Sequence, residues 1–387
     1  MIGRWRRQPL WLRAGVLLLL TVLAVAGVEL WARGQAPQLP GWSRQVSDGT
    51  LMNGHPTRLW GMREGVQHNA GATATINRLG LRGPVPEVPR PAGRERILIL
   101  GDSSFFGHGV GDRDTLAAQL GARLRARGLD VDVVNAAVAG YSVVQSRLLM
   151  DEVGWGLQPT LVVYANVWSD NTFDAFRDED LIRSRRVARL NPLVHSAAFR
   201  LLASRLARER VVVWRPEDGW PQERVRRVPL DRFSALHDAL VREGAARGAG
   251  ALFIQPTNRE LLELDPRIEN GPRAPDRFWK PYFQVFAALG ACHGAPQVAL
   301  TPPFRSALDR GRQMDDLFLD MMHPTPLGQG IVAAQVDAAL QAAGWPGRDL
   351  VGAGQPCDTS HIVDVPTPEW FSGDGAESPQ RLLFLDP

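Results

Sequence analysis

Residues 96–104 read RILILGDSS, and this stretch decides the fold of the chain. Its continuous apolar run predicts a short, buried β-strand that ends at Leu100, because Gly101 and Asp102 are turn-forming residues. Ser103 therefore follows the carboxyl end of a buried strand, which is where open α/β sheets bind their ligands. Taken alone, Gly-Asp-Ser is more simply explained by a turn or a helix cap, since all three residues are common there.

The sequence around this stretch alternates between short apolar runs and segments with helical periodicity. Strands that alternate with helices predict a parallel β-sheet covered on both faces. We therefore expect an α/β fold, in which a five-stranded parallel sheet is the middle layer of a three-layer α/β/α sandwich. The predicted strands are 96–100, 130–134, 161–165, 251–255 and 297–300, and the predicted helices are 115–127, 142–151, 230–247, 283–292 and 326–343.

The N-terminus has the pattern of an exported protein. Four arginines within the first 13 residues precede an apolar run, 14–28. The longer stretch 10–31, with Arg13 and Glu29 near its ends, is long enough to span a bilayer, for which a helix needs about 20 residues. Trp11 and Trp31 lie where interfacial aromatic residues are found, and the positive-inside rule keeps the arginine-rich end cytoplasmic. The alternative is a signal peptide cleaved near Ala24-Val25-Ala26. The first interpretation gives a single-pass protein of the inner membrane with its domain in the periplasm or outside the cell, and the second a secreted protein.

Composition divides the rest of the chain. We expect a short cytoplasmic N-terminus (1–9), the transmembrane helix (10–31), a stem rich in Pro and Gly (32–93), the main domain (94–345) and an irregular tail (346–387). Residues 182–229 of the main domain are predicted to be an insertion. Its arginine-rich part predicts either binding of an acidic polymer or lipid head groups, or a solvated helix face.

The basic residues and the cysteines exclude several classes of protein. All 44 basic residues are Arg except Lys280, so no P-loop lysine is present. A net charge of only +3, without a dense basic run in the main domain, argues against nucleic-acid binding. Cys292 and Cys357 either form one disulfide, as an oxidising compartment would allow, or are two free thiols. No Cys/His cluster has metal-ligand spacing, and we expect neither a metal nor a cofactor.

A serine nucleophile needs a base, and the base needs an orienting carboxylate. Two histidines follow an aspartate at a spacing of three, in the pairs Asp320/His323 and Asp358/His361. The first pair directly precedes a helix that Pro326 begins, so it lies on a loop at a defined helix end. The second pair lies in the irregular tail, where a solvated loop is the simpler explanation. The context therefore favours His323 as the base and Asp320 as its orienting group.

In this order the motifs resemble those of the SGNH, or GDSL-type, serine hydrolases, over about residues 94–343. The first block of that family is matched around Ser103, the second by 135–142 and the last by 320–328. The upstream stretch 76–83 resembles a leader found in membrane-anchored members. The resemblance implies a flavodoxin-like sheet and a catalytic triad of Ser103, Asp320 and His323. It also implies an oxyanion hole to which Ser103 and Gly140 contribute backbone N–H groups.

The third block departs from the family pattern Gly-x-Asn-Asp. Val167 stands at the glycine position and Ser169 at the asparagine position, whose amide donates to the oxyanion in the family. A serine hydroxyl can donate but is shorter, and Asn171 or Asn166 can supply an amide if the loop bends differently. Losing one oxyanion donor costs about 10²–10³ in rate. We therefore expect Ser169 or Asn171 to be the third donor, or the enzyme to be slow or specialised.

These residues and the resemblance together predict an exported, membrane-anchored serine esterase that needs no cofactor or metal. Its substrate would be an O-acyl ester, such as an acetyl group on an envelope or extracellular glycan, or a lipid ester. Two alternatives remain at this stage. A glycan O-acyltransferase would use the same triad with a sugar hydroxyl as acceptor, whereas a catalytically silent envelope binding or assembly protein would explain the departure at Ser169. Oligomeric state is not predicted.

Overall fold

The computed structural model describes residues 9–35, 51–174, 177–190, 193, 196–206, 225–263, 276–352 and 354–364. Parts of five predicted regions lie outside the described residues: the cytoplasmic end (1–8), the stem (36–50), the main domain (175–176 and 264–275), its insertion (191–192, 194–195 and 207–224) and the tail (353 and 365–387). The chain divides into two compact units. One combines Met1–Gly41 with Arg183–Pro221, and the other combines Trp42–Ile182 with Gln222–Pro387.

The second unit is built on a parallel sheet of five strands in the order β11-β10-β7-β5-β6. The five predicted strands are thereby confirmed. They are β5 (Glu95–Leu100), β6 (Val131–Asn135), β7 (Leu161–Tyr164), β10 (Gly250–Gln255) and β11 (Gln297–Ala299). The chain passes from β5 to β6 on one side and then to β7 on the other. The strand order therefore reverses at β5, and a crevice beyond the carboxyl ends of the strands is expected at that point.

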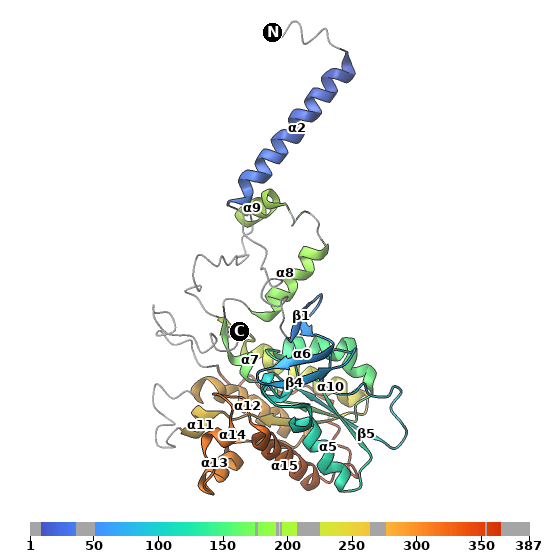
Figure 1. Ribbon diagram of the computed structural model, residues 1–387, viewed down its shortest axis with the longest axis vertical. Coiled ribbons are helices and arrows are strands. Elements are labelled where there is room, and N and C mark those ends of the chain that lie inside the picture. Colours follow the sequence, from blue (N-terminus) through green and yellow to red (C-terminus); the bar gives the residue numbers. More distant parts are fainter. Residues whose placement is uncertain are drawn as a thin grey trace. The chain divides into compact units, whose positions relative to one another are not determined.

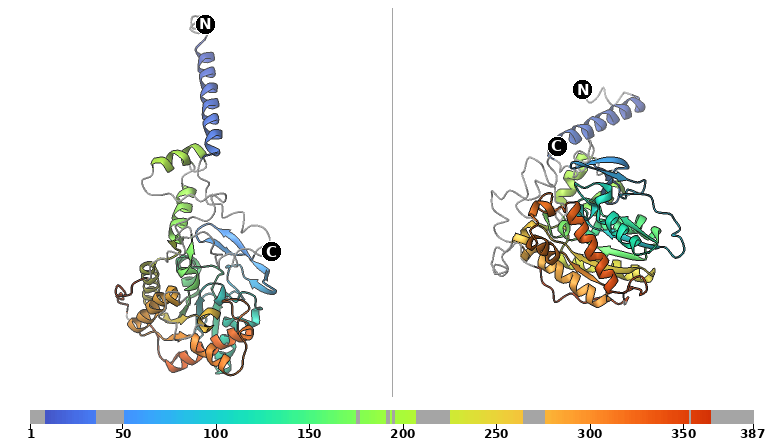
Figure 2. Two further views of the ribbon diagram at one scale, coloured as in Figure 1. Left: turned by 90° about the vertical axis from the view of Figure 1, so that its left-hand side faces the viewer. Right: turned by 60° about the horizontal axis from the view of Figure 1, so that its bottom comes forward.

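Helices cover both faces of this sheet (Figures 1 and 2). On one face α5 (Leu116–Ala126) packs against α15 (Pro326–Ala342). On the other face α10 (Leu230–Ala246) packs against α6 (Val143–Leu149) and α12 (Asp276–His293). The three-layer α/β/α sandwich predicted from the sequence is thus confirmed. The shorter helices are α4 (Ser103–Phe106), α7 (Trp168–Asn171), α11 (Arg259–Glu263), α13 (Thr301–Asp309) and α14 (Met314–Leu317), with single turns at Asp112–Asp114, Met150–Gly154 and Trp155–Leu157.

The described part of the predicted stem, residues 51–93, packs closely on the sheet unit. It contains two antiparallel hairpins, formed by β1 (Met52–His55) with β2 (Leu59–Met62) and by β3 (Gly65–Asn69) with β4 (Ala72–Ile76). The leader residue Arg82 is buried and donates to the carbonyl oxygens of Phe106 (2.9 Å), Gly107 (2.7 Å) and Val110 (2.7 Å). These bonds fix the loop that follows Ser103, so the leader supports the nucleophile turn.

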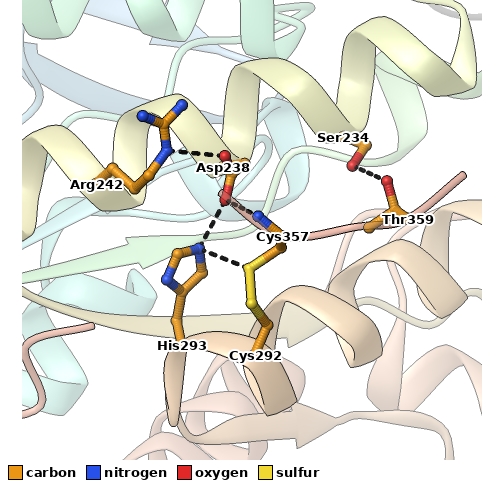
Figure 3. The surroundings of a disulfide bond; sticks show 7 residues. All are labelled: Ser234, Asp238, Arg242, Cys292, His293, Cys357 and Thr359. Atoms are coloured by element: carbon orange, nitrogen blue, oxygen red, sulfur yellow. Dashed lines mark hydrogen bonds and ion pairs between the residues drawn. A yellow bond between two sulfur atoms is a disulfide. The ribbon is translucent and has the colours of Figure 1, made fainter. Parts of the chain in front are cut away.

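The tail is tied to the sheet unit by a disulfide between Cys292 and Cys357 (Figure 3). Of the two alternatives for the cysteines, the structure therefore has the disulfide. Asp238 lies beside it and accepts from His293 Nε2 at 2.8 Å, and His293 Nε2 is also 3.2 Å from Cys357 Sγ. Farther along the tail, Asp364 forms an ion pair with Arg226.

The first unit contains the N-terminal helix α2 (Leu10–Arg33) and α9 (Ala197–Leu206). The helix α8 (Asp178–Leu190) begins in the other unit and ends in this one. The 24 residues of α2 are apolar and long enough to cross a membrane, a test that a signal sequence also passes. Glu29 near its end accepts hydrogen bonds from Ser196 Oγ and from the first backbone N–H of α9, both at 2.8 Å.

Candidate active site

Ser103 begins the short helix α4, directly after the turn that ends β5. Asp102 caps this helix, because its Oδ1 accepts from the Ser104 N–H at 3.1 Å. The helix ends at Gly107, whose φ of +86° is in the left-handed region that favours glycine. Burial raises the pKa of Asp102 to about 6, although the Ser104 N–H and the charge of His323 act in the opposite direction. The turn therefore holds Ser103 at the carboxyl edge of the sheet.

Ser103, His323 and Asp320 form a continuous chain of hydrogen bonds. The Ser103 Oγ lies 2.8 Å from His323 Nε2, and His323 Nδ1 lies 2.5 Å from Asp320 Oδ2. The other oxygen of Asp320 accepts the backbone N–H groups of Met322 and His323, both at 2.9 Å. Burial raises the pKa of Asp320, but the hydrogen bond and charge of His323 outweigh burial and hold that pKa well below its usual value. Asp320 is therefore a carboxylate at neutral pH, as an orienting group must be.

The alternative histidine does not join this chain of bonds. His361 is exposed, and Asp358 accepts two hydrogen bonds from Ser360 instead of orienting an imidazole toward Ser103. His323, by contrast, is 3% exposed. The structure thus brings together the pair that the sequence context favoured.

The loop of His323 is held by the start of α15, as the sequence predicts. Thr325 caps this helix, because its Oγ1 accepts the Gly328 N–H at 3.1 Å, and Pro326 is its first residue. One helical turn on, Gln329 Nε2 donates to Ser104 O (2.8 Å) and its Oε1 accepts the Leu116 N–H (2.9 Å). The base and the nucleophile turn are therefore held at a fixed separation by hydrogen bonds from one helix.

Arg259, which the sequence did not indicate, supports the loop of Asp320. Its Nε donates to Asp320 O (2.7 Å), its Nη2 donates to Phe318 O (2.7 Å), and its backbone N–H donates to Met321 O (3.0 Å). Arg259 follows β10, about sixty residues earlier in the chain. No local pattern could connect it with this loop.

His108 is a second residue of the site that the sequence did not indicate. Its ring packs against that of His323 in a tilted arrangement, with ring centroids 4.4 Å apart and an angle of 42° between the planes. Burial, followed by the charge of His323, lowers the pKa of His108 to about 4, so its ring is neutral at neutral pH. The sequence signal was the pair of glycines on either side of it, Gly107 and Gly109, because glycines are typical of tight loops. In the structure both have positive φ and form a tight loop after Ser103.

Two backbone N–H groups of the predicted oxyanion hole have no acceptor among the described residues. Within the described part of the chain, neither the Ser103 N–H nor the Gly140 N–H donates a hydrogen bond. Gly140 has φ +75°, a conformation that a residue with a side chain would adopt only with strain. The Val138 N–H donates to Gly101 O at 3.1 Å, which ties the Gly140 loop to the end of β5.

The third block forms α7 and leaves two candidates for a third donor. Asn166 Nδ2 already donates to Tyr141 O at 3.3 Å. Ser169 is half-buried, and Asn171 is buried with no hydrogen-bond partner for its Nδ2 among the described residues. Asp170 is buried and accepts the Val143 N–H at 2.8 Å, which links this block to α6 of the second block. Ser169 and Asn171 therefore remain the two candidates for a third donor.

One group of potential metal ligands, Cys292, His293 and Cys357, lies around the disulfide. Both sulfur atoms are bonded to each other, so they are not thiolate ligands in this state. The hydrogen-bond partner of His293 and Cys357 is Asp238, which in turn pairs with Arg242, and none of these residues belongs to the Ser103 site. It therefore has no part in the chemistry considered below.

No family model and no curated protein matches the chain. Three similar solved structures are the α/β hydrolase LAE5 from the metagenome of Lake Arreo, Spain (19% identity, 64% of this chain and 95% of that chain, TM-score 0.42), the acetylxylan esterase Axe2 from Geobacillus stearothermophilus (18%, 65% and 94%, 0.42) and the psychrotrophic esterase EstA from Pseudoalteromonas sp. (16%, 64% and 98%, 0.39). At this identity and TM-score these similarities say nothing about activity or substrate, so we base the proposal on the residues of this chain.

Proposed function

We propose that this protein hydrolyses carboxylic esters through a covalent acyl-Ser103 intermediate. The observation that carries the proposal is the hydrogen-bonded chain from Ser103 through His323 to Asp320 at the point where the strand order reverses. A serine hydroxyl beside an oriented imidazole is the arrangement that activates a weak nucleophile. The position is also where an open α/β sheet places its ligand.

The reaction follows from the two hydrogen bonds. As Ser103 Oγ attacks the ester carbonyl carbon, His323 Nε2 takes its proton, and the Asp320 carboxylate stabilises the imidazolium that forms. When the tetrahedral intermediate collapses, His323 gives the proton to the leaving alcohol. His323 then takes a proton from water, which attacks the acyl-serine, and the proton returns to Ser103 Oγ as the acid leaves. One ester and one water give one acid and one alcohol.

The oxyanion of each tetrahedral intermediate would be held by the N–H groups of Ser103 and Gly140 and by Ser169 or Asn171. The first two are supported by their open N–H groups, and the third by the unpartnered amide of Asn171 and the half-buried Ser169. Removing one such donor lowers kcat by about 10²–10³. Replacing Ser169 by Ala and Asn171 by Ala, one at a time, should therefore identify the third donor by the larger loss.

We further propose that the protein is exported and held in the membrane by α2. The apolar helix and the disulfide support export, because disulfides persist in oxidising compartments. The substrate would then be an O-acyl ester outside the cytoplasm, such as an acetylated glycan or a lipid ester. Recovery of the mature protein with its N-terminal helix would support anchoring, and recovery of a chain that starts after Ala26 would contradict it.

The activity is tested by labelling the full chain with a fluorophosphonate, which reacts with activated serines. Labelling should be lost in Ser103→Ala and His323→Ala and kept in His361→Ala, which removes an exposed histidine at the same Asp-x-x-His spacing. A folded wild-type protein that is not labelled would contradict the esterase proposal and support the binding-protein alternative. Hydrolysis of a simple ester without an added glycan would favour the esterase over the acyltransferase.

A further inference from the structure

The chain that returns from the insertion lies directly beside the third block. The short strands β8 (Phe173–Asp174) and β9 (Val225–Arg226) pair antiparallel at the base of the insertion. Beyond β9 the pairing continues, because the Arg227 N–H donates to Thr172 O at 2.9 Å and the next N–H donates to Asp170 O at 3.1 Å. The base of the insertion is therefore part of the site, whereas the sequence suggested only an appendage.

Arg227 forms a hydrogen bond with the second block. Its Nη2 donates to the carbonyl oxygen of Gly140 at 2.8 Å, and its Nε and Nη2 form a bidentate pair with Asp178 at 3.0 and 2.8 Å. The Arg227 and Asp178 side chains are only 9% and 3% exposed. Asp178 also accepts from Ser142 Oγ at 2.6 Å. Two bonds from one buried ion pair thus reach the loop that carries Gly140.

Arg226, the preceding residue, forms a hydrogen bond with the third block. Its Nη1 donates to Asn171 O at 2.7 Å, and its guanidinium lies over the Phe173 ring, 4.5 Å from the centroid. Its Nε and Nη2 form a bidentate pair with Asp364 of the tail, at 3.1 and 3.0 Å. Arg226 is 7% exposed, whereas the side chain of Asp364 is 32% exposed, so the network is buried at its arginine and reaches the surface at the tail.

We propose that Arg226 and Arg227 are positioning residues that hold the second and third blocks in the geometry of the oxyanion hole. This inference rests on the proposed function. Successive residues of a strand point to opposite faces, so two adjacent arginines can serve two separate loops. Guanidinium is always charged and has a rigid fork of donors, which suits it to hold a carboxylate and a carbonyl at once.

The mechanism acts through the geometry of the donors. An N–H group stabilises an oxyanion only when it is held about 2.7–3.1 Å from the developing charge. A glycine has more backbone freedom than other residues. The hydrogen bond from Arg227 to the carbonyl oxygen of Gly140 restricts the ψ angle of this glycine. The third block lacks the family asparagine, so the position of its backbone matters more. Arg226 holds that backbone at Asn171 O.

The test compares Arg227→Lys with Arg232→Met in the full chain purified in detergent. Lysine keeps the charge beside Asp178 but loses the fork, so it avoids leaving a buried carboxylate unpaired. Arg232 is a matched control, because it is exposed and forms a bidentate pair with Glu179, the neighbour of Asp178. Among the described residues it forms no hydrogen bond with either block. With p-nitrophenyl acetate, Arg227→Lys should lower kcat about 10–100-fold, since small misplacements of catalytic groups have effects of this size. Its KM should stay within about threefold, the pattern of an interaction lost only in the transition state.

Two further measurements exclude a merely structural role. An alkylboronic acid, which forms a tetrahedral adduct with a reactive serine, should bind Arg227→Lys more weakly by the same factor as the loss in kcat. Hydrogen exchange should speed up in segments 138–144 and 168–172 of Arg227→Lys and not in Arg232→Met, at unchanged melting temperature. Arg226→Lys should give the same changes, centred on 168–172.

The outcomes distinguish failure of the positioning role of Arg226 and Arg227 from failure of the proposed function. Unchanged exchange in both segments, or changed exchange with unchanged kcat, would overturn the inference. A wild-type protein that neither hydrolyses the ester nor reacts with the fluorophosphonate would contradict the proposed function, and hydrogen exchange alone would then decide whether the arginines hold the two blocks.

Discussion

The two halves of the candidate site are built in different ways. The loop that carries Asp320 and His323 is local, because the two residues are three positions apart and the helix that fixes them follows at once. The oxyanion half is assembled from segments far apart in the chain. Gly140 and Asn171 are held by Arg227 and Arg226, and Arg226 is paired with Asp364 of the tail. A local half can be identified from its motif, whereas an assembled half becomes visible only in three dimensions.

We expect the largest loss of activity from a substitution in the local half. Asp320→Asn keeps the shape of the side chain but can present an N–H to His323, which favours the wrong tautomer. We expect kcat for p-nitrophenyl acetate to fall about 10⁴-fold with the protein still folded. Asp358→Asn, at the same spacing in the tail, is the control and should have no effect. A loss of less than tenfold in Asp320→Asn would contradict the role of Asp320.

A smaller effect is expected from the brace of the local half. Arg259→Gln removes the hydrogen bonds to the carbonyl oxygens of Phe318 and Asp320. We expect kcat to fall about 10-fold or more. A misplacement of 1 Å can lower the rate about 10²-fold, and the loop would move by a fraction of that distance. The control is Arg305→Gln, which also removes an arginine-to-carbonyl bond, from Arg305 to Leu261 O. Equal effects in the two variants would show that general destabilisation, and not the loop, is responsible.

The assembled half should lose activity when the tail is released from the sheet unit. The disulfide between Cys292 and Cys357 closes a separation of 65 residues and fixes the segment that leads to Asp364 (Figure 3). Removing both sulfurs with a Cys292→Ser, Cys357→Ser variant should lower the free energy of unfolding by about 2–4 kcal/mol. Because Asp364 holds Arg226, we also expect kcat to fall about threefold to tenfold while labelling of Ser103 persists. Unchanged kcat in a variant that is destabilised would separate the tail from the oxyanion half.

The smallest effect concerns pH and stability at His108. Its pKa in the folded state, about 4, is below its ordinary value of 6.5, so the unfolded chain binds more protons between these values. The free energy of unfolding should therefore fall as pH falls from about 6.5 to 4, with a slope of at most about 1.4 kcal/mol per pH unit from this residue. His108→Phe keeps the ring stacked on His323 and should flatten that slope. His68→Gln, which changes an exposed histidine, should leave the slope as it is.

The sequence was sufficient for the sheet, because the five strands are continuous apolar runs between turn signals. It also indicated the local half of the site, since Ser103 follows the end of a strand and His323 precedes a capped helix. Arg226, Arg227, Arg259 and His108 were not predicted. Their roles depend on which carbonyl or ring each side chain meets after folding, and a chain with 44 basic residues gives no local sign of which arginines are buried.

The segment before the sheet shows the same limit. Its Pro and Gly content indicated a stem, but buried contacts such as the bond from Trp60 Nε1 to Ala139 O (2.9 Å) join it to the second block. Composition describes the flexibility of an isolated chain and not the surface on which that chain packs. The third donor of the oxyanion hole was left between Ser169 and Asn171 for a related reason, since a one-residue shift in a loop changes which side chain faces Ser103.

The central claim is that Ser103 is the nucleophile activated by His323. It is tested most directly by mixing the full chain with excess p-nitrophenyl acetate, quenching in acid within the first turnover and locating the acyl group by mass spectrometry of the digested protein. The account predicts a burst of p-nitrophenol and an acetyl group on the peptide that contains Ser103, both absent in His323→Ala. Steady ester hydrolysis without an acetyl group at Ser103, or hydrolysis that persists in Ser103→Ala, would contradict it.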